Sequence, residues 1–400
     1  MTRRTFVVLI AGCLILLVSM GNRNSFGLFV GPIAEDLFDN EVTVISLALA
    51  IQHLFWGLSQ PMVGAIADKY GSGRTIAVSG LVYAWGLWLI ANADSAWDLY
   101  TGAGLAVGFA GSGTTFAVIL AVIARNTAPE KRSMIYGVAT AMGTGGQITM
   151  APISQTLIDQ FGWSVAMMIM ASMILLFVPL GLVMTGKAAD VTEEGGGANS
   201  VTEAVNEARS HSGYLYLTAG FFVCGFQVFT VGVHLPNWLN TLGFEGLGAW
   251  ALFTIGASNF FGTLTAGYLG GKYSKKRLLS GLYLMRSVFF TIFLLVPISP
   301  VSVIVFSAAI GFLWLGTVPL TNGIVGQVFG VKYLATLSGI VFASHQLGAF
   351  LGIYGAGLIF DRTGSYDLVW QIAIVLGVVA ALLHMPINEA PIRRVPAPAE

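Results

Sequence analysis

Twelve apolar segments of helix length constrain this chain more than any other feature. About 20 apolar residues are what an α-helix needs to cross the hydrocarbon core of a bilayer. Lipid offers no partner for open backbone groups, so spanning segments of this kind have to be helical. With 56% hydrophobic and 10% charged residues, the composition also excludes a soluble globular domain, in which about 25% of residues are charged. The expected segments are 6–31, 43–67, 75–93, 97–124, 133–158, 163–186, 214–240, 248–270, 277–297, 301–326, 333–360 and 367–386.

A polar stretch divides these segments into six and six. Residues 187–212 contain Glu193, Glu194 and a run of three glycines, which is the composition of a hydrated linker. We therefore expect a six-helix bundle at 1–186, a linker at 187–212, and a second bundle with a short tail at 213–400. The expected fold class is an all-α membrane protein with twelve transmembrane helices in two pseudo-symmetric six-helix bundles. The N-terminal apolar run is expected to be the first span, because it is too long for a signal peptide.

The basic residues are distributed unevenly about these segments. An even number of spans places both termini and the linker on one side, and the opposite side then carries only Arg362. Positively charged loops mark the cytoplasmic side. We therefore expect both termini in the cytoplasm and the protein in a cytoplasmic (inner) membrane of bacterial type. The basic residues on the terminal side are Arg3, Arg4, Lys69, Arg74, Arg125, Lys131, Arg132, Lys187, Arg209, Lys272, Lys275, Lys276, Arg277, Lys332, Arg393 and Arg394.

A short polar loop follows the second segment, and the second half of the chain repeats it. Its pattern is Gly64-x-x-x-Asp68-Lys69-x-Gly71-x-x-Arg74, in which the glycines allow a tight turn and the charges keep it in water. A loop used twice between apolar segments indicates a duplicated bundle. In the second copy, Gly267, Lys272, Tyr273 and Arg277 stand where the first has Gly64, Lys69, Tyr70 and Arg74.

The first loop resembles the signature loop between the second and third helices of the major facilitator superfamily. In that family the Asp and the Arg of the motif latch neighbouring helices and stabilise the outward-facing state. The second copy carries Gly271 in place of the Asp, which leaves a matching latch there in question. The resemblance implies a substrate site near mid-membrane between the halves, lined by spans 1, 4, 7 and 10. It also implies a gating role for Gly64, Asp68, Arg74, Lys272 and Arg277; two ordinary positively charged loops are the alternative.

Two arginines, Arg23 and Arg286, lie inside apolar segments, and no Asp or Glu lies in the middle of any segment. An arginine at bilayer depth is costly unless it faces a partner or a water-filled cavity. A bound anion would supply that partner, because a guanidinium matches the geometry of a carboxylate. For Arg23, in the first segment, the alternatives are bonds to carbonyl groups of a neighbouring span or exposure at the outer face. For Arg286, in the ninth segment, a structural role that bridges spans is equally compatible.

Polar and aromatic side chains recur on the segments expected to line the cavity. In the seventh segment Gln227 and His234 lie on one polar stripe. Aligning Pro32 with Pro236 places Gln227 at the position of Arg23, so we expect Gln227 and His234 to face the cavity. His234 would bind substrate or carry a proton, with a packed histidine as the alternative. Further candidates, each also compatible with helix packing, are Asn24, Thr114, Phe116, Trp314, Thr317, Asn322 and His345, and the second segment adds the polar residues Gln52, His53 and Gln60.

A second resemblance concerns the stretch 21–29 and the sequence His234-Leu235-Pro236. Together with the paired loops, these resemble the branch of monocarboxylate porters and oxalate/formate antiporters, which moves small organic anions. In the porters a lysine of span 1 contributes to substrate and proton handling, and Arg23 or Asn24 stands near that position. The chain departs from the branch in span 8. Asn259 and Thr263 stand where the porters carry an Asp and an Arg, so one of the embedded arginines would replace that anchor, or the substrate differs.

These observations predict a secondary transporter that moves a small, monocarboxylate-like organic anion by alternating access, with a proton as a candidate second cargo. Arg23 would anchor the carboxylate, and Trp314 and Phe116 would shape the apolar end of the site. A facilitator or an exchanger is equally compatible. The alternatives are efflux of amphiphilic compounds, favoured by the many aromatic residues, and a membrane sensor with the body of a transporter.

Several function classes find no support in the sequence. The embedded histidines have no acidic neighbours at metal-binding spacing, no glycine-rich phosphate loop occurs, and no nucleophile has a base beside it. We therefore expect neither an enzyme nor a metal or cofactor site. No basic and aromatic face suggests nucleic-acid binding. The expected surroundings are membrane lipid, and the expected state is a monomer.

Overall fold

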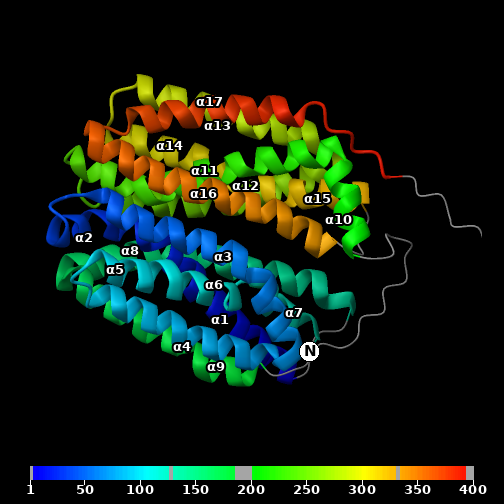
Figure 1. The fold of residues 1–400 in the computed structure, drawn as a ribbon, viewed down its shortest axis with the longest axis horizontal. Helices are drawn as coiled ribbons and strands as arrows, with labels where there is room; N and C mark the ends of the chain where they lie inside the picture. The colour runs from blue at the N-terminus through cyan, green and yellow to red at the C-terminus, as the bar shows by residue number, and fades with distance from the viewer. Residues whose placement is uncertain (1–2, 126–128, 185–200, 330–333, 393–400) are drawn as a thin grey trace, which may run out of the picture.

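The computed structural model describes residues 3–125, 129–184, 201–329 and 334–392, and these ranges form helices and no strand. Figure 1 shows the helices of the first half of the chain, coloured blue to green, beside those of the second half, coloured green to red. The first group comprises α1 (Arg3–Ser25), η1 (Phe26–Phe29), α2 (Val30–Leu37), α3 (Val42–Tyr70), α4 (Ser72–Ala91), α5 (Ala96–Leu99), η2 (Tyr100–Val107, π-helical), α6 (Gly108–Gly113), α7 (Phe116–Arg125), α8 (Pro129–Leu175) and α9 (Phe177–Val183). The second group comprises α11 (Ser212–Thr241), α12 (Leu247–Lys272), α13 (Lys275–Leu295), α14 (Pro300–Phe312), α15 (Thr317–Phe329), α16 (Leu334–Thr363) and α17 (Asp367–His384).

Ten stretches of the described chain are long and apolar enough to cross a membrane, and they cover eleven of the twelve expected spans, all but the fourth. One stretch, Ala141–Val183, contains two spans, because Gly162 inside α8 has φ 78° and ψ 165° and ends one helix before the next begins. Another expected span is not a continuous α-helix. Irregular backbone at Thr114 and Thr115 separates α6 from α7, so this span consists of shorter pieces.

The two halves repeat one close helix–helix contact. A Cβ atom at Gly146 in α8 would overlap the carbonyl oxygen of Leu17 in α1, and a Cβ atom at Gly348 in α16 would overlap that of Phe222 in α11. Small residues let helix backbones approach in this way inside a membrane. Each half is therefore built on the same glycine-dependent pair, span 1 against span 5 and span 7 against span 11. The all-α fold of two related six-span bundles is confirmed.

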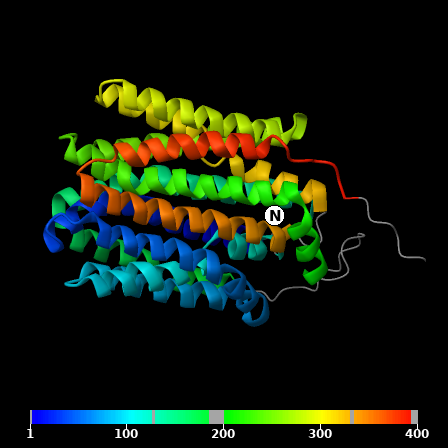
Figure 2. The same ribbon diagram turned by 45° about the horizontal axis from the view of Figure 1, so that its top comes forward.

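The halves contact each other mainly through α3 with α16 and through α8 with α12. Figures 1 and 2 both show α16 (orange) running beside α3 (blue). We call the end of the molecule near the N label, α10 (Val201–Ser210) and the C-terminal tail the terminal end, and the other end the far end (Figure 1).

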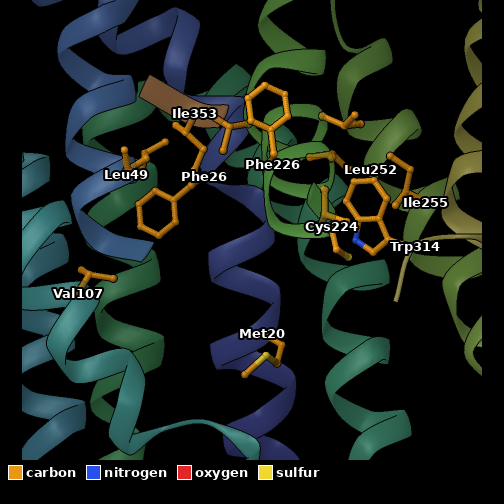
Figure 3. Close-up of a cluster of buried hydrophobic side chains, with 14 of the residues drawn as sticks. Met20, Phe26, Leu49, Val107, Cys224, Phe226, Leu252, Ile255, Trp314 and Ile353 are labelled. Atoms are coloured by element: carbon orange, nitrogen blue, oxygen red, sulfur yellow. The ribbon is translucent and has the colours of Figure 1, made fainter. Parts of the chain in front are cut away.

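At the far end the halves are sealed by apolar side chains from both groups. Phe26, Leu49, Phe226 and Ile353 gather there from η1, α3, α11 and α16, and all four are buried (Figure 3). A Cβ atom at Gly27 would overlap the carbonyl oxygen of Gly232 in α11, so η1 lies directly against the second half. In this structure the far end is therefore closed between the halves.

The expected division at 187–212 stays a prediction, because residues 185–200 lie outside the described ranges. The described part of the expected linker includes the short helix α10, which packs against α11 and α16. The C-terminal tail lies against the second bundle. Glu389 accepts a hydrogen bond from the amide of Lys276 at the start of α13, and the amide of Ile392 donates to the carbonyl of Val328 at the end of α15.

Candidate substrate site

Arg23 lies near the end of α1, close to the middle of the apolar stretch Arg4–Leu37. Its guanidinium carbon is 3.8 Å from the ring centroid of Trp56 in α3. Nη2 donates to the sulfur of Met20 at 2.9 Å, and the buried Nε has no hydrogen-bond partner. No carbonyl or carboxylate of the described chain bonds to this side chain. Its hydrogen-bonding edge is therefore held only by a thioether, a weak acceptor.

Polar atoms without partners surround this guanidinium. Oε1 of Gln52, both ring nitrogens of His53 and Nε1 of Trp56 are buried and have no hydrogen-bond partner among the described residues. Buried polar groups are normally bonded, so each exception needs a reason, such as a role in binding. The cavity measures about 10 Å³, roughly the space of one water molecule. Its lining includes Ser19, Arg23, Gln52, His53, Trp56 and Tyr83.

Aromatic rings connect this cavity to the second half. The ring centroids of His53 and Phe229 in α11 are 3.9 Å apart, and those of Trp56 and Phe342 in α16 are 5.2 Å apart. His345 of α16 packs on the other side, with its ring 5.7 Å from Phe229. The cavity of Arg23 thus lies against the interface between the halves, and any movement of the halves changes its walls.

Arg286 of α13 is the second embedded arginine, and it is fully satisfied by the protein. It is 1% exposed, and Nε and Nη2 donate to the carbonyl of Leu313 at 3.1 and 2.6 Å. Nη2 also donates to the carbonyl of Trp314, and Nη1 donates to Oε1 of Gln227 at 3.3 Å. These carbonyls lie where α14 ends and the chain is irregular before α15. Of the two alternatives for Arg286, the contacts are those of a structural bridge between spans.

The expectation that Gln227 faces the cavity opposite Arg23 is wrong. Its Nε2 donates to the carbonyl of Ala373 in α17 at 2.8 Å, and its Oε1 accepts from Arg286. The side chain therefore points into the second bundle. The partners that hold the amide belong to span 9 and span 12.

His234 is also placed differently from the expectation. Its Nδ1 is 3.1 Å from the hydroxyl of Tyr366, and its Nε2 is 2.8 Å from the carbonyl of Ile353. The residue is 0% exposed. Both ring nitrogens are used within the second bundle, which corresponds to the packed-histidine alternative.

The remaining candidates lie in both bundles. Thr114 is buried at the break in span 4, where its hydroxyl lies 3.0 Å from that of Ser19. Thr317 is buried at the start of α15, 3.2 Å from the sulfur of Cys224. Trp314 packs beside Cys224, Leu252 and Ile255 in the second half, away from Met20 (Figure 3). Of the rest, Asn24 bonds the carbonyl of Met20, Phe116 is half-buried near Gly143, Asn322 is exposed, and His345 bonds the side chain of Gln346.

Two residues of the Arg23 site, Trp56 and Tyr83, were not among the candidates. Trp56 lies one helical turn from Gln52 and His53. Residues at this spacing share one face of a helix, so the polar residues of span 2 could have indicated that Trp56 lies beside them. The internal repeat of the sequence could have indicated Tyr83. When the two halves are aligned so that Arg74 matches Arg277, Tyr83 matches Arg286. Each half therefore has an arginine at the contact between its first and third spans, but from a different span.

Comparison with known proteins places this arrangement in a family. The sequence matches the Major Facilitator Superfamily over residues 12–353. The chain belongs to this superfamily. It is accordingly a multi-pass membrane transporter, as the loop signature indicated.

Curated relatives of this superfamily member are distant but align along most of their length. Monocarboxylate transporter 13 of Rattus norvegicus is 25% identical over 95% of this chain and 92% of its own. The uncharacterised MFS-type transporter YcxA of Bacillus subtilis (strain 168) is 24% identical over 91% and 90%. The uncharacterised MFS-type transporter YhjX of Escherichia coli (strain K12) is 22% identical over 87% and 86%.

Solved structures of transporters share the fold. A bacterial homologue of the human lysosomal transporter Spinster, in an inward-facing and unoccupied conformation, superposes with a TM-score of 0.77. It is 13% identical and covers 96% of this chain and 97% of its own. The occupied form of that protein gives a TM-score of 0.71 at 16% identity.

The loop residues expected to act in gating lie at the terminal end of this transporter. Gly71 has φ 102° and ends α3, as the turn requires. The side chain of Asp68 lies outside the described part, so its latch stays a prediction. Gly64 is half-buried, Arg74 and Arg277 are exposed, and Lys272 bonds the hydroxyl of Tyr268.

Proposed function

We propose that this transporter moves a small organic anion across the cytoplasmic membrane by alternating access, and that Arg23 binds the carboxylate of the anion. The observation that carries the proposal is the guanidinium of Arg23, which is held in the bundle by a thioether and an aromatic face alone. A charged group in such a place normally pairs with an opposite charge or lines a water-filled path. A carboxylate fits the free edge with two parallel N–H···O bonds.

The contrast with Arg286 supports this assignment. Arg286 has the contacts of an arginine that serves the fold, with two carbonyls and an amide oxygen around it. Arg23 has none of these, although it lies in the corresponding contact of the other half. A purely structural arginine would be expected to resemble Arg286.

Trp56 supports the same role for Arg23. A ring stacked on the face of a guanidinium holds its plane and is worth about 0.5–2 kcal/mol. Stacking leaves the N–H groups at the edge free to bind an anion. Trp56 is therefore a positioning residue in the proposal.

Span 8 offers no competing anchor. Oδ1 of Asn259 accepts hydrogen bonds from the amide of Leu315 at 3.1 Å and from the hydroxyl of Thr263 at 3.0 Å. Asn259 and Thr263 thus stabilise the packing of α12 against the irregular segment between α14 and α15. The relatives named as monocarboxylate transporters support a small carboxylate as cargo, with Arg23 in place of an anchor in span 8.

Alternating access in this proposal is a rocking of the two halves about the Arg23 cavity. The seal at the far end belongs to one state, and the other state requires α3 and α16 to part there. We place both termini in the cytoplasm because of the charge asymmetry of the loops. Membrane lipid surrounds the bundle, and the transporter acts as a monomer with no cofactor.

Efflux of amphiphilic compounds is the second candidate. The observation in its favour is the row of aromatic rings, His53, Trp56, Phe229, Phe342 and His345, that both halves contribute next to the cavity. Such a wall would bind a flat apolar cargo. The unpartnered polar atoms around Arg23 favour a small anion instead.

The test is uptake of labelled L-lactate, pyruvate and succinate into proteoliposomes. Arg23→Gln should abolish uptake of the transported anion and leave the melting temperature near that of the wild type, because only the bond to Met20 and the stacking on Trp56 are lost. Arg23→Lys should retain part of the uptake with a higher KM, since an ammonium keeps the positive charge but lacks the two parallel N–H donors of a guanidinium. Arg209→Gln, which removes an exposed arginine of α10, serves as the control. Undiminished uptake by Arg23→Gln would exclude Arg23 from the site.

A further inference from the structure

One histidine of this chain differs from the other four. All five lie in the described ranges, and His53 is the one whose two ring nitrogens both lack a hydrogen-bond partner. The others are held through at least one nitrogen: His211 by the amide of Tyr214, His234 by Tyr366 and Ile353, His345 by Gln346, and His384 by the carbonyl of Ala380. His53 is 3% exposed, so water at the surface does not satisfy it either.

His53 lies beside the proposed anion anchor. It lines the same small cavity as Arg23, together with Gln52, whose Oε1 is also unpartnered. Its other side packs on Phe229 of the second half. The imidazole therefore belongs both to the anion site and to the moving interface.

From this placement, and resting on the function proposed above, we propose that His53 takes up a proton together with the anion bound by Arg23. A protonated imidazole in the empty cavity would add a second positive charge beside the guanidinium, and like charges repel strongly in a medium of low dielectric constant. A carboxylate on Arg23 removes that repulsion and accepts an N–H of the ring. Because coupling between two ligands is reciprocal, a proton on His53 also tightens the binding of the anion.

Among the groups that face His53, Arg23 carries the charge that controls protonation of the imidazole. Tyr83 of α4 lines the same cavity, and His345 of α16 lies beyond Phe229. The pieces η2 and α6 contribute only Val107 and glycines. No carboxylate of the described chain lines the cavity, so the anion itself supplies the negative charge.

The proton balance of a transport cycle is simple. The proton comes from water on the side to which the site is open and bonds to the lone pair of a ring nitrogen. When the halves rock, the contact between His53 and Phe229 opens, and the proton leaves to water on the other side with the anion. One anion and one proton cross together, which is electroneutral symport.

The first experiment uses the wild type, so it does not depend on how a variant folds. Purified transporter in weakly buffered detergent solution with a pH indicator is mixed with the anion that the uptake assay identifies. We expect proton uptake between pH 6 and 8, and none on addition of chloride. Absence of anion binding would overturn the proposed function and this inference with it. Anion binding without proton uptake would overturn this inference alone.

The second experiment compares variants by the pH dependence of KM. In the wild type KM should fall with falling pH by up to about tenfold per unit, the limit for one coupled proton. In His53→Gln, and in His53→Asn, KM should no longer depend on pH, while uptake of the anion continues by exchange. His211→Gln, at the N-terminus of α11 and outside the lining of the cavity, should keep the wild-type slope. The assignment would be overturned if both His53 variants kept the wild-type slope, or if His211→Gln lost it.

Discussion

The carboxylate of Asp361 accepts the backbone amide of Val42 at 2.9 Å, which ties the far end of α16 to the first residue of α3. The second oxygen accepts the amide of Thr43 at 2.6 Å. The first amides of a helix have no partner within it, and they favour a negative charge. One carboxylate of the second half thus caps a helix of the first half, in the state that is closed at this end.

Replacement of Asp361 by asparagine should favour opening at the far end. Asparagine keeps one acceptor oxygen but loses the negative charge and the second acceptor, at a cost of about 1 kcal/mol, which shifts a two-state equilibrium about fivefold. Ser46→Cys provides the reporter, because Ser46 is buried in the α3–α16 contact against Gly357. We expect faster maleimide labelling of the introduced thiol, measured on its peptide by mass spectrometry, when Asp361→Asn is present.

Asp159 offers the matched control for this experiment. It occupies the corresponding place in the first half, since Asp159-x-x-Gly162 repeats as Asp361-x-x-Gly364. It bonds Gln155 of its own helix at 2.7 Å and borders an open cleft at the start of α12. Asp159→Asn should leave labelling unchanged. Equal labelling with and without Asp361→Asn would show that Asp361 does not hold the far end closed.

Replacement of Arg286 by leucine should impair folding rather than substrate binding. Two buried carbonyls and Gln227 would lose their donor, at about 1–3 kcal/mol for each unsatisfied group. We expect a much lower yield and a melting temperature well below that of Arg23→Gln, measured by intrinsic fluorescence during heating. A normal melting temperature combined with a raised KM would instead place Arg286 in the site.

Alanine at Gly146 should disrupt the pairing of α1 with α8. The added Cβ overlaps the carbonyl of Leu17, so the two backbones would have to separate. Gly145 is the adjacent control, because a Cβ there meets nothing within 4 Å. Gly145→Ala should be neutral or slightly stabilising, since alanine is the better helix former by about 1 kcal/mol. Equal melting temperatures of the two variants would contradict the importance of the contact.

The sequence alone was sufficient for the architecture. The length of the apolar segments, the repeated loop from Gly64 to Arg74 and the asymmetry of the basic residues together indicated two related six-span bundles. They suffice because the bilayer imposes helices of one length range and penalises buried charge, whatever the details of packing. The same reasoning singled out Arg23 and Arg286 as the two embedded charges.

Only the tertiary structure decided which of these arginines the protein satisfies. Leu313 and Trp314 supply carbonyls to Arg286 because span 10 breaks beside it, while Arg23 meets the face of Trp56. A span that is apolar on its lipid side and on its packed side carries little periodic signal of which face looks inward. For this reason Gln227 and His234 could be placed on helices but not on the correct side of them. The direction of a side chain in such a bundle is fixed by the neighbours it bonds, and those come from distant parts of the chain.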